Sequence, residues 1–127
     1  MEKYDIIQID DAPYGLQDME REAKRAGLSY MSGSNLYDLG QILRKNDAGV
    51  WVIDGVFPRR KGERAQKSGD LAVREIQKVR KDAKIILYSS TPEDFSELAG
   101  LGVRLENKDE ISPEKLVEDI KILLGKF

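Results

Sequence analysis

The chain has 127 residues and contains no cysteine and no histidine, which excludes disulfide scaffolds, histidine-based catalytic triads and zinc sites that use histidine. Its 21 basic and 23 acidic residues give a formal net charge of −2, which favours neither nucleic acid nor a membrane as partner. No apolar run approaches the roughly 20 residues of a membrane span, and Met1–Asp10 lacks a signal-peptide pattern, so we expect one cytoplasmic domain over residues 1–127.

Five short runs of the sequence are typical of β-strands, and each is bounded by glycine, proline or polar residues. In chain order these runs are Tyr4–Ile9, Leu28–Ser32, Val50–Ile53, Lys84–Ser89 and Val103–Glu106. The third run is apolar throughout and is broken by Gly55 and Pro58, a pattern typical of a strand buried on both faces of a parallel sheet. Asp54 follows that run directly.

A segment with apolar residues at helical spacing follows each strand-like run. The helix start signals, in chain order, are Pro13, Ser34, Ser68 or Asp70, Thr91 with Pro92, and Ser112 with Pro113. In the third helix, the residues predicted to face the core are Leu71, Val73, Ile76 and Val79. The polar segment Gly55–Lys67 before that helix is predicted to be a long loop. Alternation of strands and helices predicts an α/β fold with a parallel sheet and helices on both faces.

Polar side chains lie at or just after the carboxyl ends of four of the five predicted strands. They are Asp10 and Asp11, then Asp54, then Ser89 and Ser90, and finally Lys108. Parallel α/β proteins place their chemistry just beyond the carboxyl ends of the strands, so these side chains together indicate a site. Taken singly, the first two aspartates would also fit helix caps, the serines strand-end hydroxyls, and the lysine a solvated surface side chain.

The charges of this group predict a bound cation. Two carboxylates about 4 Å apart repel each other by roughly 4 kcal/mol at an effective dielectric constant near 20. Mg²⁺ suits three such groups, because it accepts carboxylate ligands and leaves positions for water and phosphate oxygens. An ionised Asp54 is a competent nucleophile for phosphoryl transfer, while Lys108 and Ser89 can bind phosphoryl oxygens.

Four motifs in this order resemble the receiver domain of two-component response regulators over nearly the whole chain. They are IDD at Ile9–Asp11, IDGVFP at Ile53–Pro58, YSST at Tyr88–Thr91, and Lys108 after the fifth strand. The resemblance implies a doubly wound, five-stranded parallel sheet of flavodoxin-like (βα)5 type with strand order 2-1-3-4-5. In that order, the four strands with polar ends are neighbours.

The resemblance also implies what each residue does. Asp54 would accept a phosphoryl group from a histidine kinase or phosphotransfer protein, Ser89 would be the switch hydroxyl with Ser90 beside it as a cofactor-binding residue, and Lys108 would bind the phosphoryl group. The Mg²⁺ ligands would be Asp10, Asp11, Asp54 and the backbone carbonyl of Val56. Such a chain catalyses its own phosphorylation and dephosphorylation but acts mainly as a switch whose output is a protein contact.

Two other functions remain open at this point. One is a degenerate receiver that binds partner proteins without phosphorylation. The other is a phosphatase of the haloacid-dehalogenase type, which places its nucleophile in an Asp-x-Asp pattern on the first strand, whereas Asp10 and Asp11 are adjacent.

The sequence also departs from the receiver pattern, with Asp109 where a proline is usual and Leu105 where an aromatic is common. The segment Gly55–Lys67 is longer than usual and carries five basic residues against one acid.

Overall fold

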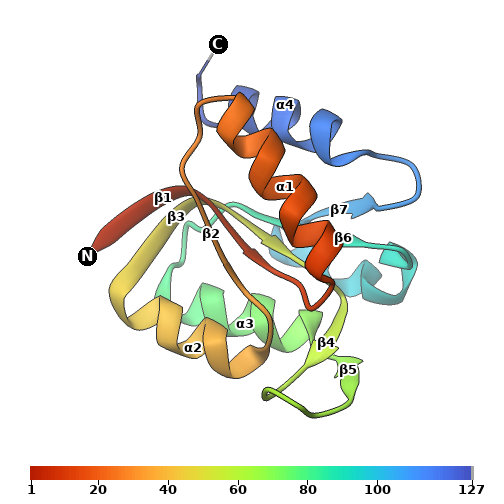
Figure 1. Cartoon of the computed structure of the whole chain (residues 1–127). Helices are drawn as coiled ribbons and strands as arrows, with labels where there is room; N and C mark the ends of the chain where they lie inside the picture. The colour runs from red at the N-terminus through yellow and green to blue at the C-terminus, as the bar shows by residue number, and fades with distance from the viewer. Residues whose placement is uncertain (127) are drawn as a thin grey trace.

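Five short strands form a central parallel sheet in the computed structural model, which describes residues 1–126 (Figure 1). They are β1 (Glu2–Ile9), β2 (Tyr30–Gly33), β3 (Asn46–Ile53), β6 (Ile85–Ser89) and β7 (Arg104–Asn107). Their order in the sheet is β2-β1-β3-β6-β7, and every neighbouring pair is parallel. This confirms the flavodoxin-like order 2-1-3-4-5, because β4 and β5 belong to a separate hairpin.

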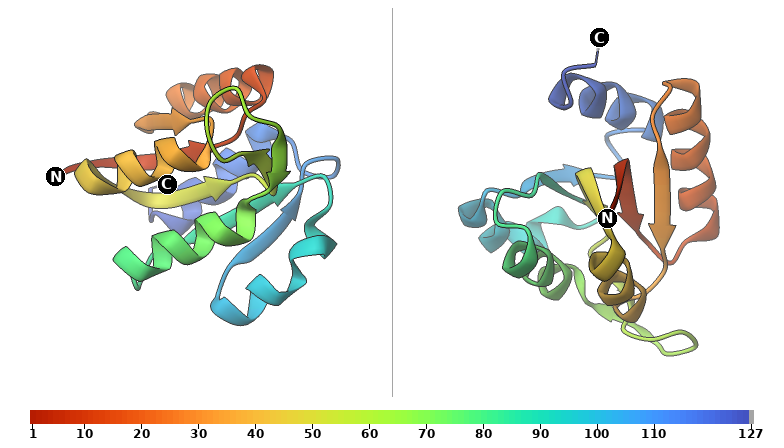
Figure 2. Two further views of the ribbon diagram at one scale, coloured as in Figure 1. Left: turned by 90° about the horizontal axis from the view of Figure 1, so that it is seen from below. Right: turned by 90° about the vertical axis from the view of Figure 1, so that its left-hand side faces the viewer.

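Helices cover both faces of this sheet, as Figure 2 shows. The helical segments are α1 (Pro13–Arg25), α2 (Leu36–Lys45), α3 (Gly69–Val79), the 3-10 segment η1 (Pro92–Leu101) and α4 (Pro113–Leu123). One core cluster joins α1 and α4 to one face of the sheet, and the other joins α2, α3 and η1 to the opposite face. Within residues 1–126, no helix combines the length and the apolar character that a bilayer crossing requires.

Strand β3 contributes side chains to both core clusters, which explains its unbroken apolar run. Trp51 and Ile53 pack on the α2–α3 side, whereas Val50 and Val52 pack on the α1–α4 side. The strand begins earlier than predicted, at Asn46, because α2 ends at Lys45 and the chain enters the sheet directly. As a result, β1 and β3 are paired along almost their whole lengths.

The second helix begins one residue later than Ser34 would require, so the prediction of Ser34 as its cap is wrong. Asn35 is the N-cap, and its Oδ1 accepts a hydrogen bond from the backbone N of Asp38 at 2.8 Å. The carboxylate of Asp38 in turn accepts from the backbone N of Ser34 at 3.0 Å. The first bond satisfies a free N–H group in the first turn of the helix, and the second joins the Asp38 side chain to the residue before the cap.

The predicted loop Gly55–Lys67 is instead a folded β-hairpin, which we call the arm. Its strands are β4 (Val56–Pro58) and β5 (Ala65–Lys67), paired antiparallel. Phe57 has 0% exposure and anchors the arm in the core on the α2–α3 side. Gly62, with φ of 84°, lies in the turn between the two strands. Figure 2 shows the arm, in lime green, projecting beyond the body of the domain.

The core face of α3 also differs from the prediction. Ala72, Val73 and Ile76 are fully buried, whereas Leu71 and Val79 are exposed. The three buried residues occupy one stripe of the helix, which leaves Leu71 and Val79 on its flanks. The start of the helix is as predicted at Ser68, although the Ser68 hydroxyl donates to the carbonyl of Phe57 at 2.8 Å and not to the helix.

Candidate functional site

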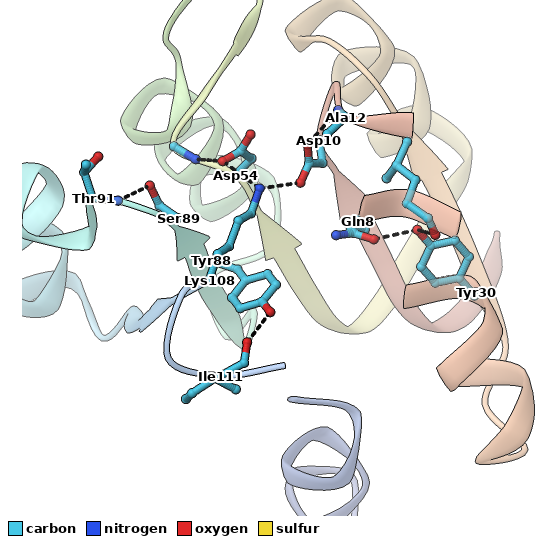
Figure 3. Close-up of polar contacts among 12 residues, drawn as sticks. Gln8, Asp10, Ala12, Tyr30, Asp54, Tyr88, Ser89, Thr91, Lys108 and Ile111 are labelled. Atoms are coloured by element: carbon cyan, nitrogen blue, oxygen red, sulfur yellow. Dashed lines mark hydrogen bonds and ion pairs between the residues drawn. The ribbon is translucent and has the colours of Figure 1, made fainter. Parts of the chain in front are cut away.

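Lys108 joins two of the predicted aspartates at the carboxyl edge of the sheet (Figure 3). Its Nζ lies 2.7 Å from Asp10 Oδ2 and 3.3 Å from Asp54 Oδ1. Asp10 is almost completely buried, at 1% exposure, and Asp54 is partly buried. An ammonium that bridges two carboxylates with little solvent around them is not an ordinary surface lysine.

The backbone fixes these residues by extending the hydrogen bonding of the sheet past the strand ends. The backbone N of Asp10 donates to Gly33 O at 3.1 Å, and that of Asp54 donates to Ile9 O at 2.9 Å. The backbone N of Lys108 donates to Ser89 O at 3.0 Å. Parallel pairing therefore brings side chains from distant parts of the chain to one edge.

Asp11 completes a cluster of three carboxylates with Asp10 and Asp54. One carboxylate oxygen from each lies within 4.8 Å of the others, and Asp11 is exposed at the rim. Neither Asp10 nor Asp11 caps α1, whose N-cap is Ala12 without a side-chain bond. Asp10 Oδ1 accepts from the backbone N of Ala12 at 2.9 Å, while Oδ2 faces Lys108. A set of three hard oxygen donors fits Mg²⁺.

The protonation behaviour of Asp54 follows from its surroundings. Burial, and then the negative charge of Asp10, raise the pKa of Asp54 to about 6, although Lys108 and the Gly55 N–H act in the opposite direction. Burial alone would lower the pKa of Lys108, but Asp10 and Asp54 outweigh it and raise that pKa overall. The lysine is therefore charged at neutral pH, and Asp54 is mostly ionised there.

Ser89 lies in a tightly packed corner beside Asp54. Its side chain is 3% exposed, and its Oγ accepts from the backbone N of Thr91 at 3.1 Å. A Cβ atom on Gly55 would lie 2.8 Å from Ser89 Oγ and 2.5 Å from Cε2 of Phe95. A side chain at this position would displace Phe95 or Ser89, because side chains from β6 and η1 meet there.

The remaining predicted site residues are less enclosed. Ser90 is exposed directly after Ser89. Val56 begins β4 two residues after Asp54. Its side chain is exposed, and its backbone is paired in register with that of Lys67. Asp109 follows Lys108 through a trans peptide bond, and no peptide bond among residues 1–126 is cis. Leu105 packs partly buried against the α2–α3 core cluster.

Three neighbours of the site were not predicted from the sequence. Lys108 Nζ lies 5.9 Å from the ring centroid of Tyr88, whose hydroxyl donates to the carbonyl of Ile111. Phe95 packs beside Gly55, and Lys67 Nζ lies 5.0 Å from its ring centroid. The backbone of Phe95 is non-helical (φ −122°, ψ 22°), so η1 is kinked at this residue. For Phe95, the only signal in the sequence was that it is the one aromatic residue between Thr91 and Gly102.

Similarity to known proteins is found at the level of structure. No protein-family model matches the sequence, and no curated protein sequence matches it. Solved structures of CheY-like receiver domains match nearly the whole chain.

A response regulator receiver domain protein from Methanospirillum hungatei JF-1 has a TM-score of 0.78 and 16% identity, with 99% of this chain and 95% of that chain covered. The Francisella response regulator 1452 receiver domain has a TM-score of 0.78 and 18% identity over 99% of this chain and 98% of that one. The chemotaxis response regulator CheY4 of Vibrio cholerae has a TM-score of 0.75 and 17% identity over 97% and 98%. At these identities, the comparison shows that the fold is that of receiver domains.

Proposed function

We propose that residues 1–127 form a receiver domain that acts as a phosphoacceptor switch in a two-component phosphorelay. The observation that carries this proposal is the bridge from Lys108 to both Asp10 and Asp54 at the carboxyl edge of a receiver fold. This bridge supports the proposal, because a nucleophile, a cation for phosphoryl oxygens and a metal-binding carboxylate would then share one small site.

Asp54 is the residue that would accept the phosphoryl group. The carboxylate contacts Lys108 Nζ and, at 2.7 Å, the Gly55 backbone N, and both contacts fall on Oδ1. Oδ2 is therefore the oxygen that would attack phosphorus. A bond forms between Asp54 Oδ2 and phosphorus, while the phosphorus–nitrogen bond of a phosphohistidine on the donor protein breaks. The histidine nitrogen keeps the electron pair of that bond and takes up a proton.

The residues around Asp54 would support this transfer by charge and position. Asp10, Asp11, Asp54 and the carbonyl of Val56 would hold Mg²⁺, which when bound neutralises the charge of carboxylate and phosphoryl oxygens. Lys108 would bind a phosphoryl oxygen, and the Ser89 hydroxyl would turn from the Thr91 N–H to donate to another. Ser90, at the exposed rim, would be a further donor to the phosphoryl group.

The partners in this proposal are a histidine kinase or phosphotransfer protein as donor and a protein that recognises the phosphorylated form. Receiver domains act in such relays within the cytoplasm, and we place the chain there as part of the proposal. The alternative is a receiver fold that binds partners without being phosphorylated. The folded basic arm, which needs no phosphoryl group to form, is the observation that favours this alternative.

Incubation with acetyl phosphate and Mg²⁺, followed by intact-mass measurement, tests the proposal directly. Wild-type protein is expected to gain one phosphoryl group, and Asp54→Asn and EDTA-treated protein to gain none. A phosphorylated Asp54→Asn protein would disprove the assignment of the acceptor. Wild-type protein that gains nothing from acetyl phosphate, and that does not bind beryllofluoride with Mg²⁺, would favour the phosphorylation-independent module.

A further inference from the structure

The arm carries positive charge that the rest of the chain does not neutralise. Its residues include five cations and one acid, Glu63, in a chain whose net charge is −2. In the part of the chain that the structure describes, no cation of the arm forms an ion pair with a carboxylate, whereas Arg80 and Arg104 both do. The unpaired cations are Arg59, Arg60, Lys61, Arg64 and Lys67. These charges are available to a partner.

The arm is also held in one position, unlike a solvated loop. Beyond the buried anchor Phe57, the backbone N of Tyr37 on α2 donates to Arg59 O at 2.9 Å. The guanidinium of Arg60 lies 5.4 Å from the ring centroid of Tyr37. These contacts hold the backbone of the arm at Arg59 and the guanidinium of Arg60 before any partner arrives. Binding therefore loses less conformational entropy than it would with a mobile loop.

An open groove of about 600 Å³ lies between the arm and helices α2 and α3. Three guanidinium groups line it, from Arg44, Arg59 and Arg60. The carboxylates of Glu63 and Glu75 line it as well, together with Tyr37, whose side chain is 53% exposed. The groove therefore offers several cations, two anions and an aromatic surface.

The presence of both cations and anions in the groove favours one class of anionic partner over another. A nucleic acid backbone presents phosphate at every step, and the two glutamates would repel it. A protein segment can place carboxylates against the arginines and hydrogen-bond donors against the glutamates. Tyrosine and arginine are also the side chains enriched at the energetic centres of protein interfaces. We propose that the groove between the arm and α2 is a docking surface for an acidic segment of a partner protein.

This docking surface goes beyond the proposed phosphorylation of Asp54 and exists in the unphosphorylated chain. The test measures binding of the unphosphorylated protein to a short, fluorescein-labelled peptide. The peptide consists of glutamates on either side of central leucines, and binding is followed by fluorescence anisotropy at low salt. The variant Arg59→Ser/Arg60→Ser is expected to bind the peptide at least about fivefold more weakly than wild type. High salt is expected to weaken binding to wild type.

The matched control is Arg21→Ser/Arg25→Ser, which removes the same charge from exposed ion pairs on α1, on the opposite face of the sheet. Its affinity for the peptide is expected to change less than about twofold, since the peptide does not reach α1. Amide chemical shifts of ¹⁵N-labelled wild type, a measurement that needs no variant, should change around Tyr37, Arg44 and Arg59.

Three results would overturn the proposal. The first is no peptide binding by wild type, and the second is equal weakening in both double variants. The third is tighter binding of a single-stranded oligothymidine of matched charge than of the peptide, which would identify a nucleic acid partner and not a protein.

Discussion

Lys108 Nζ lies closer to Asp10 than to Asp54, at 2.7 Å against 3.3 Å. Asp10 is the more deeply buried of the two carboxylates, so it holds the ammonium while Asp54 is the looser partner. A looser contact is the one that can be exchanged for another anion. This asymmetry agrees with the proposal that Asp54 is phosphorylated while Lys108 stays in place beside Asp10.

Removal of the ammonium is expected to leave the carboxylates of Asp10 and Asp54 without the cation that they share. We predict that Lys108→Met lowers the free energy of unfolding in EDTA by about 2–3 kcal/mol, because one partner of a buried ion pair is lost. Mg²⁺ should stabilise this variant more than it stabilises wild type, since the cation then meets less competition for Asp10 and Asp54. Urea unfolding with and without Mg²⁺ measures both effects. Lys115→Met, which removes a surface pair with Asp119, is the control, and equal losses in the two variants would contradict the prediction.

The raised pKa of Asp54 makes stability depend on pH in the metal-free protein. The folded state binds this proton more tightly than the unfolded state, so the contribution of Asp54 is present below pH 4 and is lost as pH rises to about 6. The shift corresponds to at most about 3 kcal/mol. In EDTA, the free energy of unfolding of Asp54→Asn should therefore equal that of wild type near pH 4 and exceed it at pH 7. A stability difference that does not change between these pH values would disprove the assigned shift.

Any side chain at Gly55 is predicted to destabilise the fold. The Cβ of Gly55→Ala would meet the Phe95 ring at 2.5 Å and Ser89 Oγ at 2.8 Å, so we expect a loss of about 1–3 kcal/mol in stability. Slower phosphorylation by acetyl phosphate should accompany it, because Ser89 is displaced. Gly100→Ala is the control, since its Cβ has open space. The double variant Gly55→Ala/Phe95→Leu should recover part of the loss in a double-mutant cycle, and strict additivity would count against the contact.

Activation is expected to alter the segment from Ser90 to Gly102. Turning the Ser89 hydroxyl towards a phosphoryl group breaks its bond from the Thr91 N–H and disturbs the kinked η1 at Phe95. We predict that beryllofluoride with Mg²⁺ changes amide hydrogen exchange in this segment and leaves exchange in α1 unchanged. Protection that is identical with and without beryllofluoride would show that the segment does not respond.

The sequence predicted the sheet and its polar edge because both depend on strong local patterns. The apolar run Val50–Ile53 must be buried on both faces, and Asp54 directly after it must then lie at the edge. The cap of α2 was misassigned because Ser34 and Asn35 are both good caps, and only the position of Asp38 decides between them.

The arm was missed for a different reason. Gly55–Lys67 is mostly polar, so periodicity gave no sign of strands, and its stability depends on the insertion of Phe57 into a core built by distant residues. The contact of Phe95 with Gly55 likewise joins segments that are far apart in the sequence. Such contacts follow from tertiary packing and leave no local signal.

Trp51 provides an intrinsic optical signal for the unfolding measurements. It is the only tryptophan, it is fully buried in β3, the middle strand of the sheet, and its indole N–H has no hydrogen-bond partner within residues 1–126. In register, it lies between Ile7 of β1 and Ile85 of β6. An indole in such apolar surroundings emits at shorter wavelength than one in water. A red shift of its emission therefore reports opening of the central sheet itself, from a single known position and without any label.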